Sequence, residues 1–440
     1  MDTAKSGAAG AKPNAVELAS RLVSATCPAC GHHVAAPFYS GRRQPLATLG
    51  WPRTASEAKS MPDLPLDFVR CTSCGHVFNS SFDYGQVPYS KMPNLMFNRG
   101  TLWSGFLRAC CQEIVRRLPA KPTVVEIGYG DAGFLSALSA ACPAGRFIGF
   151  DPHGAAAEDT RLELRQELFD PCVHLGELRP DLIVSRHVLE HLTDPLGFIQ
   201  HIALAAACLG FRPLMYLEVP CIDRALETGR TEDFYYEHNS HFTTGSFCRM
   251  LEASGARLET LGHGYDRELV YAFVRLEARA ELVQHGFDAL AFNVAAADAG
   301  VGMREDLAQL CASGKRVAIW GGTGKSAAFL CAHGADADRF PLVVDSDAAK
   351  VGTHVPGTGQ LIRFRDWLKQ HPVEAVLIPA QWRAADIVRE MREQSIAFET
   401  VLIPHRGRLI DFLNTSHPYD VSLSNLARAL ECRCPELSEV

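Results

Sequence analysis

VVEIGYGDAGFL, residues 124–135, is the most informative segment for the fold, because it runs from an apolar strand through a glycine turn into the start of a helix. Further strand-like runs at 147–151, 181–185 and 214–220 are separated by helix-like segments. Such alternation is typical of a parallel sheet with crossover helices. The sequence therefore predicts an α/β domain over residues 101–277.

The rest of the chain divides by texture into four further segments. Residues 1–15 predict a flexible tail, and residues 16–100 a loop-rich N-terminal domain. An alanine-rich helical bridge is expected over residues 278–311. Over residues 312–440 the strand and helix rhythm restarts, beginning with KRVAIWG at 315–321, which predicts a second α/β domain.

Composition bounds the class of protein. The chain has 440 residues, of which 47% are hydrophobic and 21% charged, so a largely disordered chain is excluded. The net charge of −7 provides no overall field for nucleic-acid binding. The longest apolar run, 202–211, is too short to span a bilayer, and the N-terminus has no apolar signal segment. We expect a cytoplasmic protein with no nucleic-acid or membrane partner.

Two cysteine pairs predict a metal site. CPAC at 27–30 and CTSC at 71–74 form the pattern C-x2-C-x40-C-x2-C. In a reducing compartment such pairs more often hold a metal than form disulfides, and two knuckles of this kind supply four thiolates to one zinc ion. Four protein ligands leave no position for a catalytic water, so the predicted zinc is structural. The predicted ligands are Cys27, Cys30, Cys71 and Cys74.

The glycine turn predicts a cofactor site. Gly128, Gly130 and Gly133 fit the G-x-G-x-x-G spacing, so NAD remains an alternative. Glu126 favours a different ligand, because its carboxylate would repel a pyrophosphate and attract the positively charged S-adenosylmethionine (SAM). Asp151 ends the next strand, where an acidic group suits the hydroxyls of a ribose. A structural turn without a ligand is the third alternative. The predicted cofactor-binding residues are Glu126, Gly128, Gly130, Asp131, Asp151 and His187.

With these motifs the chain resembles the class I SAM-dependent methyltransferases. More narrowly, it resembles the three-domain C-methyltransferases of nucleotide-linked 4-keto-6-deoxy sugars. The split cysteine pairs carry this resemblance together with EIGYGDAGFL (126–135), SRHVLEHLTDPLGFI (185–199), YYEHNSHFT (235–243) and VAIWGGTGKSAAFL (317–330). It covers nearly all of the chain beyond residue 20. Two positions depart from the family: Ala132 stands where a glycine is common, and His187 where the sugar enzymes typically carry an asparagine.

The resemblance implies a fold, an activity and roles for residues. The expected fold class is α/β, with a small zinc-binding N-terminal domain, a central Rossmann-like SAM methyltransferase domain and a second Rossmann-like domain at the C-terminus. The expected enzyme transfers a methyl group from SAM to the carbon next to the ketone of a nucleotide-linked keto-deoxysugar, in a cleft between the two α/β domains. His238 would be the base and Glu237 would hold or tune its neighbours. Tyr236, His191 and Tyr89 (or Tyr84) would orient the keto oxygen.

Several alternatives stay open. His187 and His191 lie at helical spacing in HVLEH, which fits residues lining a site, ordinary helix packing or a metal pair. Lys325 in GGTGKS either contacts the diphosphate of the substrate or belongs to a turn that only packs the domain. The main functional alternative is O- or N-methylation of another small metabolite. A zinc-organised RNA-modifying protein is disfavoured by the acidic composition, and a non-catalytic binding module by the intact glycine turn.

Overall fold

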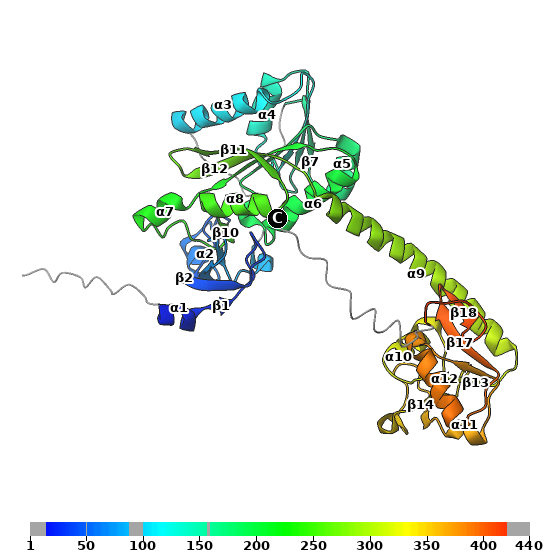
Figure 1. The fold of residues 1–440 in the computed structure, drawn as a ribbon. Helices are drawn as coiled ribbons and strands as arrows, with labels where there is room; N and C mark the ends of the chain where they lie inside the picture. Colours follow the sequence, from blue (N-terminus) through cyan, green and yellow to red (C-terminus); the bar gives the residue numbers. More distant parts are fainter. Residues whose placement is uncertain (1–14, 50, 88–99, 156–158, 420–440) are drawn as a thin grey trace, which may run out of the picture. The chain divides into compact units, whose positions relative to one another are not determined.

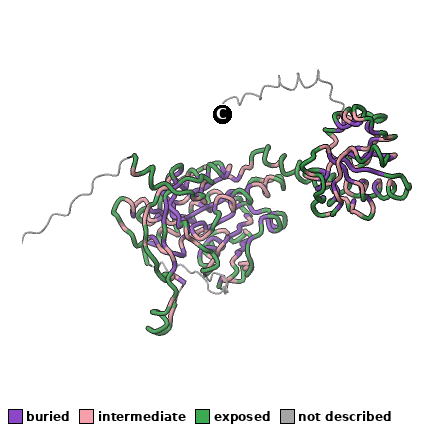
Figure 2. The backbone as a smooth tube through the Cα atoms, turned by 90° about the horizontal axis from the view of Figure 1, so that it is seen from below, coloured by how far each residue is buried: buried purple, intermediate pink, exposed green. Residues whose placement is uncertain are grey.

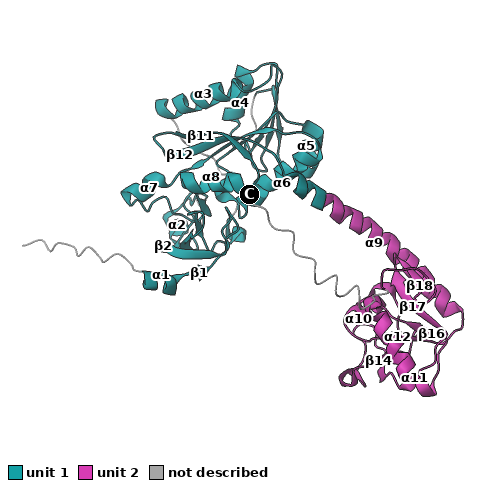
Figure 3. Ribbon diagram, viewed as in Figure 1, with its two compact units in different colours: residues 1–285 teal, residues 286–440 magenta. Residues whose placement is uncertain are grey.

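The computed structural model describes residues 15–49, 51–87, 100–155 and 159–419. The chain divides into two compact units, Met1–His285 and Gly286–Val440 (Figure 3). The first unit contains two sheets and the second unit one, and each unit has its own apolar core. No helix within the described ranges is both long and apolar enough to cross a membrane.

The N-terminal part of the first unit is an antiparallel sheet in the order β1-β2-β3-β4-β10 (Figure 1). Its elements are α1 (Ala15–Arg21), β1 (Val23–Ser24), β2 (Val34–Gln44), α2 (Ala55–Lys59), β3 (Leu64–Cys71), β4 (Val77–Asn79), η1 (Tyr84–Gln86) and β10 (Ser240–His241). The 11-residue strand β2 was not foreseen, because its mostly exposed residues do not alternate between apolar and polar. Strand β10 comes from much later in the chain, so the central domain completes this sheet.

The central sheet has the order β11-β12-β9-β8-β5-β6-β7. The last five of these strands are parallel, and β11 and β12 join antiparallel at one edge. The strands are β5 (Thr123–Ile127), β6 (Arg146–Phe150), β7 (Leu162–Arg165), β8 (Leu182–Arg186), β9 (Leu214–Pro220), β11 (Arg257–Gly264) and β12 (Leu269–Arg275). The helical elements are α3 (Thr101–Val115), α4 (Gly133–Ala141), α5 (Pro171–Leu178), η2 (Leu189–His191), α6 (Pro195–Cys208), α7 (Asp223–Thr228) and α8 (Thr244–Ala253). The predicted α/β fold of this region is confirmed.

Helices cover both faces of the central sheet. Val124 packs with α3 and α4 on one face, and its neighbour Val125 packs with α5, α6 and α8 on the other. Successive strand residues point to opposite faces, so a strand covered on both sides is expected to be apolar on both. In the apolar run of β5, Glu126 is the exception. A buried charge in such a strand therefore needs a separate explanation.

The N-terminal sheet and the central domain share one core. Cys27, Cys71 and Phe78 are buried in the same apolar cluster as Phe242 and Phe247 from the region that ends in α8. In Figure 2 the buried segments, drawn in purple, lie in the interior of the first unit, and exposed segments lie around them. The cysteine-bearing segment is therefore packed directly onto the domain that carries the glycine turn.

The second unit contains a six-stranded sheet in the order β15-β14-β13-β16-β17-β18, parallel except for β18. Its strands are β13 (Val317–Trp320), β14 (Val343–Asp345), β15 (Ile362–Phe364), β16 (Ala375–Leu377), β17 (Thr400–His405) and β18 (Arg408–Asp411). Its helical elements are α9 (Ala280–Ala312, which begins in the first unit), α10 (Lys325–His333), η3 (Ala348–Lys350), α11 (Trp367–Gln370), η4 (Gln381–Arg383) and α12 (Ala384–Glu393). Helices α9 and α10 pack on one face, and α11 and α12 on the other.

Candidate active site and cysteine cluster

The glycine turn after β5 has a backbone that only glycine adopts easily. Gly128 and Gly130 have φ angles of 75° and 55°, in the left-handed region. A Cβ on Gly128 would lie 2.5 Å from Cγ2 of Val188, so a larger residue would clash. The turn is thereby pressed against the segment that follows β8, which also carries the predicted site residues His187 and His191.

Acidic side chains brace the same turn. One carboxylate oxygen of Asp151 accepts the N–H of Gly130 at 3.1 Å, and the other accepts the N–H of His153 at 2.8 Å. Asp131 accepts the N–H of Gly133 at 2.9 Å, at the start of α4. Asp131 and Asp151, both predicted from the sequence, therefore stabilise the backbone of the turn through these hydrogen bonds.

Ala132 precedes α4 in the left-handed conformation, with φ 58°, and it is buried. The Cβ of an L-residue is strained there, which is consistent with glycine being common at this position in the family that the sequence resembles. The departure noted in the sequence therefore affects the backbone of the turn.

Glu126 is the buried charge in β5. Its side chain is 2% exposed, and its Oε2 has no hydrogen-bond partner among the described residues. Burial raises its pKa to about 8; Arg186 opposes the rise, and the carboxylates of Asp131, Glu218 and Asp151 add to it. Such a group of carboxylates would repel a pyrophosphate but would be stabilised by a cation. The residues present therefore fit SAM, which is positively charged, better than NAD.

A buried ion network adjoins Glu126. Arg186 at the end of β8 contacts its ladder partner Glu218 in β9, with Nη2 2.8 Å from Oε1. Tyr216 donates a hydrogen bond to the other oxygen of Glu218 at 2.6 Å. Burial alone would raise the pKa of Glu218, but Arg186 and His187 hold it at about 2. The carboxylate is therefore ionised, and it positions Arg186 against the ring of Phe134 at 4.1 Å.

His187 belongs to this network and does not lie on a helix. Its φ is 52°, its N–H donates to the carbonyl of Glu218 at 2.9 Å, and its Nε2 lies 3.1 Å from Glu218 Oε1. Only residues Leu189–His191 form a 3₁₀ turn. The helical spacing expected for His187 and His191 is therefore wrong, because the backbone N–H of His187 is still bonded to β9 and the helical turn begins only at Leu189.

A histidine cluster lies next along the chain. His191 Nδ1 donates to the carbonyl oxygen of Glu237 at 2.9 Å. The rings of His191 and His238 are 4.8 Å apart, and the hydroxyl of Tyr235 lies 2.8 Å from His238 Nε2. Burial, with His191, His241 and His187 adding to it, holds the pKa of His238 well below its usual value. His238 is therefore a neutral imidazole at physiological pH.

Two of the other predicted catalytic residues have different partners. Glu237 is fully buried, and its Oε1 accepts the backbone N–H groups of Thr48 and Leu49 at 2.6 and 3.0 Å. The hydroxyl of Tyr236 accepts the N–H of Asp83 at 2.8 Å. Both residues thus tie segments of the N-terminal sheet region to the histidine cluster.

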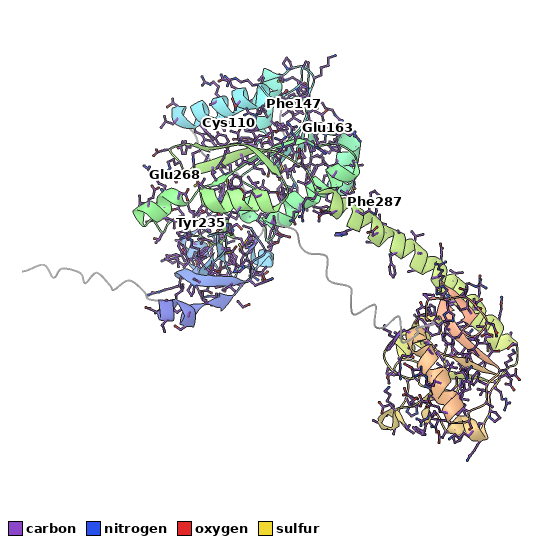
Figure 4. The ribbon with its side chains drawn as sticks, in the orientation of Figure 1. Cys110, Phe147, Glu163, Tyr235, Glu268 and Phe287 are labelled. Atoms are coloured by element: carbon purple, nitrogen blue, oxygen red, sulfur yellow. The ribbon has the colours of Figure 1, made fainter. Side chains whose placement is uncertain are left out.

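Two tyrosines were proposed from the N-terminal domain. Tyr84 lies in η1 and is 50% exposed. Tyr89 lies outside the described residues. Tyr235, which the sequence analysis did not single out, supplies the hydroxyl beside His238; in Figure 4 it lies where the central domain meets the N-terminal sheet. Of the adjacent tyrosines in YYEHNSHF, only packing decides which one faces the histidine.

The four cysteines of the two pairs come together. Cys27 and Cys74 have their Sγ atoms 3.6 Å apart, as do Cys30 and Cys71, and all four Sγ atoms lie within 4.8 Å of one another. Thiolates around a tetrahedral zinc ion at about 2.3 Å are separated by roughly 3.8 Å. The two knuckles are alike, since Gly31 and Gly75 have φ angles of 73° and 77°. The arrangement fits a four-coordinate zinc ion.

The glycine loop of the second unit lies at a polar cavity. Lys325 begins α10, and its Nζ lies 5.5 Å from the centroid of the Trp382 ring. A cavity of about 200 Å³ is lined by these two residues together with Lys350, Arg383 and Asp345. Asp345 contacts Lys350 at 3.3 Å, so part of the positive charge in the cavity is balanced within the unit.

Comparisons with known proteins identify two regions of the chain. Residues 102–261 match the family described as methyltransferase domain, and residues 255–404 match the family described as C-methyltransferase C-terminal domain. The chain is 25% identical over 403 residues to the C-methyltransferase NovU of Streptomyces niveus, covering 83% of this chain and 92% of NovU.

Solved structures resemble the chain over a smaller part. A SAM-dependent methyltransferase from Aquifex aeolicus covers 38% of this chain and 89% of its own, with 13% identity and a TM-score of 0.29. Magnesium protoporphyrin IX methyltransferase from Synechocystis with bound S-adenosylhomocysteine covers 42% and 90%, with 13% identity and a TM-score of 0.31. The two family matches and the curated relative together identify the chain as a SAM-dependent methyltransferase of the C-methyltransferase class.

Proposed function

We propose that this enzyme methylates the carbon next to the ketone of a nucleotide-linked keto-deoxysugar. The observation that carries the proposal is His238, a neutral imidazole at hydrogen-bond distance from a tyrosine hydroxyl and in ring contact with His191. Methyl transfer to carbon requires a base that removes a proton, whereas transfer to a hydroxyl or amine can proceed without an enolising base. The nucleotide and the deoxysugar follow from the family that the sequence resembles.

The cluster supplies what enolisation needs. A ketone makes the neighbouring C–H bond acidic, and His238 is in the protonation state that accepts that proton. The hydroxyl of Tyr235, whose pKa is raised by burial, remains protonated and can donate to the developing oxyanion. Bound SAM supplies a methyl group on a positively charged sulfur. The segment 186–191 connects the two parts, since Val188 packs on Gly128 and His191 contacts His238.

For the cofactor, we propose that Glu126 faces the charged groups of SAM and that Asp151 binds its ribose. The unpartnered oxygen of Glu126 and the left-handed glycines of the turn support this. For the metal, we propose one structural zinc ion held by Cys27, Cys30, Cys71 and Cys74. Four thiolate ligands leave it no open position, so it contributes stability and no step of the reaction.

Deuterium exchange tests the base. In D2O without SAM, the wild-type enzyme should exchange deuterium into the carbon next to the ketone of thymidine diphosphate-linked 4-keto-6-deoxyglucose, followed by mass spectrometry. His238→Ala should abolish both this exchange and methylation while SAM affinity stays within about twofold. His285→Ala, an exposed histidine on α9, is the matched control and should behave as wild type. Methylation by wild type without any exchange would favour the O- or N-methylation alternative, and turnover by His238→Ala would exclude His238 as the base.

A further inference from the structure

Glu190 is a buried carboxylate that the proposed function leaves unused. It lies in η2 and is 1% exposed. Neither of its oxygens has a hydrogen-bond partner among the described residues. Leaving a carboxylate buried without donors costs several kcal/mol, so packing gives no reason for an acidic residue at this position.

The titratable groups around Glu190 are imidazoles and a phenol. Oε1 lies 3.5 Å from Nδ1 of His187. One carboxylate oxygen of Glu190 and ring nitrogens of His191 and His238 lie within 4.8 Å of one another. The hydroxyl of Tyr235 is close enough for this carboxylate to add to the effect of burial in raising its pKa. One buried carboxyl group therefore faces three imidazoles, of which His187 is in contact with it and His238 is the proposed base.

The base needs such a counter-charge. Burial and three neighbouring histidines disfavour the charged form of His238, which keeps it ready to accept a proton but makes the resulting imidazolium costly. A carboxylate within about 4–6 Å stabilises an imidazolium, and a buried carboxylate does so more strongly than an exposed one. Glu218 does not serve this purpose, because Arg186 and Tyr216 already occupy its two oxygens.

We propose that Glu190 is the positioning residue of the base, which stabilises the imidazolium that His238 becomes. This inference rests on the proposed function. In the step concerned, the carbon–hydrogen bond of the substrate breaks, its electron pair stays on the substrate as the enolate, and the proton binds a ring nitrogen of His238. The negative charge of Glu190 balances the positive charge of the ring, and no further reactant takes part.

The first test compares Glu190→Gln with wild type in the deuterium exchange described above. The variant should exchange deuterium about 100-fold more slowly than wild type, which is within the range of general acid–base effects. The keto-sugar concentration that gives half the maximal rate should change less than about threefold. The pH below which the exchange rate falls should be about one unit lower in the variant than in wild type. The reason is that the imidazolium has lost its counter-charge, so the pKa of His238 is lower. Glu190→Asp retains the charge and should recover at least about tenfold over Glu190→Gln.

Three controls separate this role from others. Glu163→Gln removes a carboxylate on β7, which Figure 4 shows far from Tyr235, and should exchange as wild type. The melting temperature of Glu190→Gln should stay close to that of wild type, because the amide has nearly the same shape as the carboxyl group. Elemental analysis of the whole protein should find no divalent ion beyond that of the cysteine cluster.

The outcomes are distinct. If wild type does not exchange, the proposed function fails and the role of Glu190 falls with it. If wild type exchanges and Glu190→Gln matches it in rate and pH profile, the role is overturned while the proposed function stands. A second stoichiometric divalent ion that is lost in Glu190→Gln would also overturn it, because Glu190, His191 and His238 would then be metal ligands.

Discussion

Glu126 is a buried carboxyl group, and we propose that it faces the cationic cofactor. Its pKa of about 8 means that the ligand-free carboxyl is mostly protonated at pH 7. A positive ligand favours the ionised form, so binding at pH 7 must release a proton. Affinity is therefore expected to rise as the pH rises toward the pKa of the free enzyme and to level off above it.

We predict that SAM binds up to about tenfold more tightly at pH 8 than at pH 7, since one pKa unit corresponds to a factor of ten. Calorimetric titrations in phosphate and in Tris at pH 7 should give heats that differ by the ionisation enthalpy of the buffer. Glu126→Gln should bind more weakly and remove both effects. Equal heats in the two buffers would show that Glu126 is already ionised before SAM binds.

A second prediction concerns Ala132, whose φ of 58° is strained for alanine. Ala132→Gly relieves this strain, because glycine adopts the left-handed region without a Cβ penalty. We expect the free energy of unfolding to increase by about 0.5–1 kcal/mol, measured by urea denaturation. Ala137→Gly, within helix α4, is the control and should lower stability by a similar amount. A loss of stability in Ala132→Gly would contradict the strain argument.

At the scale of elements, the cysteine knuckles and the histidine segment belong to one structure. Strand β10, Ser240–His241, pairs with β4, which follows the second knuckle. The carbonyl of Pro28 in the first knuckle accepts the N–H of Leu196 in α6 at 3.4 Å. Loss of the proposed zinc would therefore disturb the segment that carries His238, although no cysteine lies in the cluster around it.

We predict that Cys71→Ser lowers the melting temperature of the first unit by about 10 °C or more. A structural zinc site contributes many kcal/mol to the free energy of unfolding, and each kcal/mol changes the melting temperature by about 2–4 °C. Chelation should have the same effect on wild type. Cys172→Ser, at an exposed cysteine of α5, is the matched control. Identical melting of Cys71→Ser and wild type, with zinc absent from both, would exclude the metal.

Acid should destabilise the same elements. Burial lowers the pKa of His241 to about 3, whereas the unfolded chain titrates near 6.5. The unfolded state therefore binds the proton first, so stability is lost as the pH falls below 6.5. The ring of His241 contacts those of Phe68 and Phe234, so phenylalanine can replace it. The difference in melting temperature between pH 7.5 and pH 5.5 should be smaller for His241→Phe than for wild type. An unchanged difference would mean that other groups dominate acid unfolding.

At the scale of the whole molecule, the chain consists of two compact units with separate cores. The glycine turn, the histidine cluster and the cysteine cluster all belong to the first unit. A ligand that binds only the folded first unit stabilises that unit by about 2.7 kcal/mol at 100 times its Kd. The second unit gains nothing from SAM unless it contributes to the site.

We therefore predict two transitions when the full chain is heated in a calorimeter. Saturating SAM should raise one of them by about 5–10 °C and leave the other unchanged. The transition that SAM raises should be the one that Cys71→Ser lowers. One cooperative transition, or a rise of both with SAM, would show that the units are coupled energetically.

Much of the site could not be predicted from single residues. The pair of Arg186 and Glu218 depends on which residues of β8 and β9 lie opposite each other, and one sequence carries no information about that register. Glu190 lies within HVLEH, and the sequence assigns it no role of its own. Its proximity to His238, which follows 48 positions later in the chain, arises from the packing of η2 against β10.

The features that could be predicted from the sequence are those that depend on local geometry. A left-handed backbone requires glycine, two cysteines three apart can bind one ion, and alternating apolar runs form a covered parallel sheet. Which functional side chains meet depends on the packing of distant segments. Tyr235 contacts His238, whereas the hydroxyl of Tyr236 accepts the N–H of Asp83, and Glu237 accepts the N–H of Thr48. The physical reason is that consecutive side chains point in different directions, and the packing of distant segments selects the one that reaches the site.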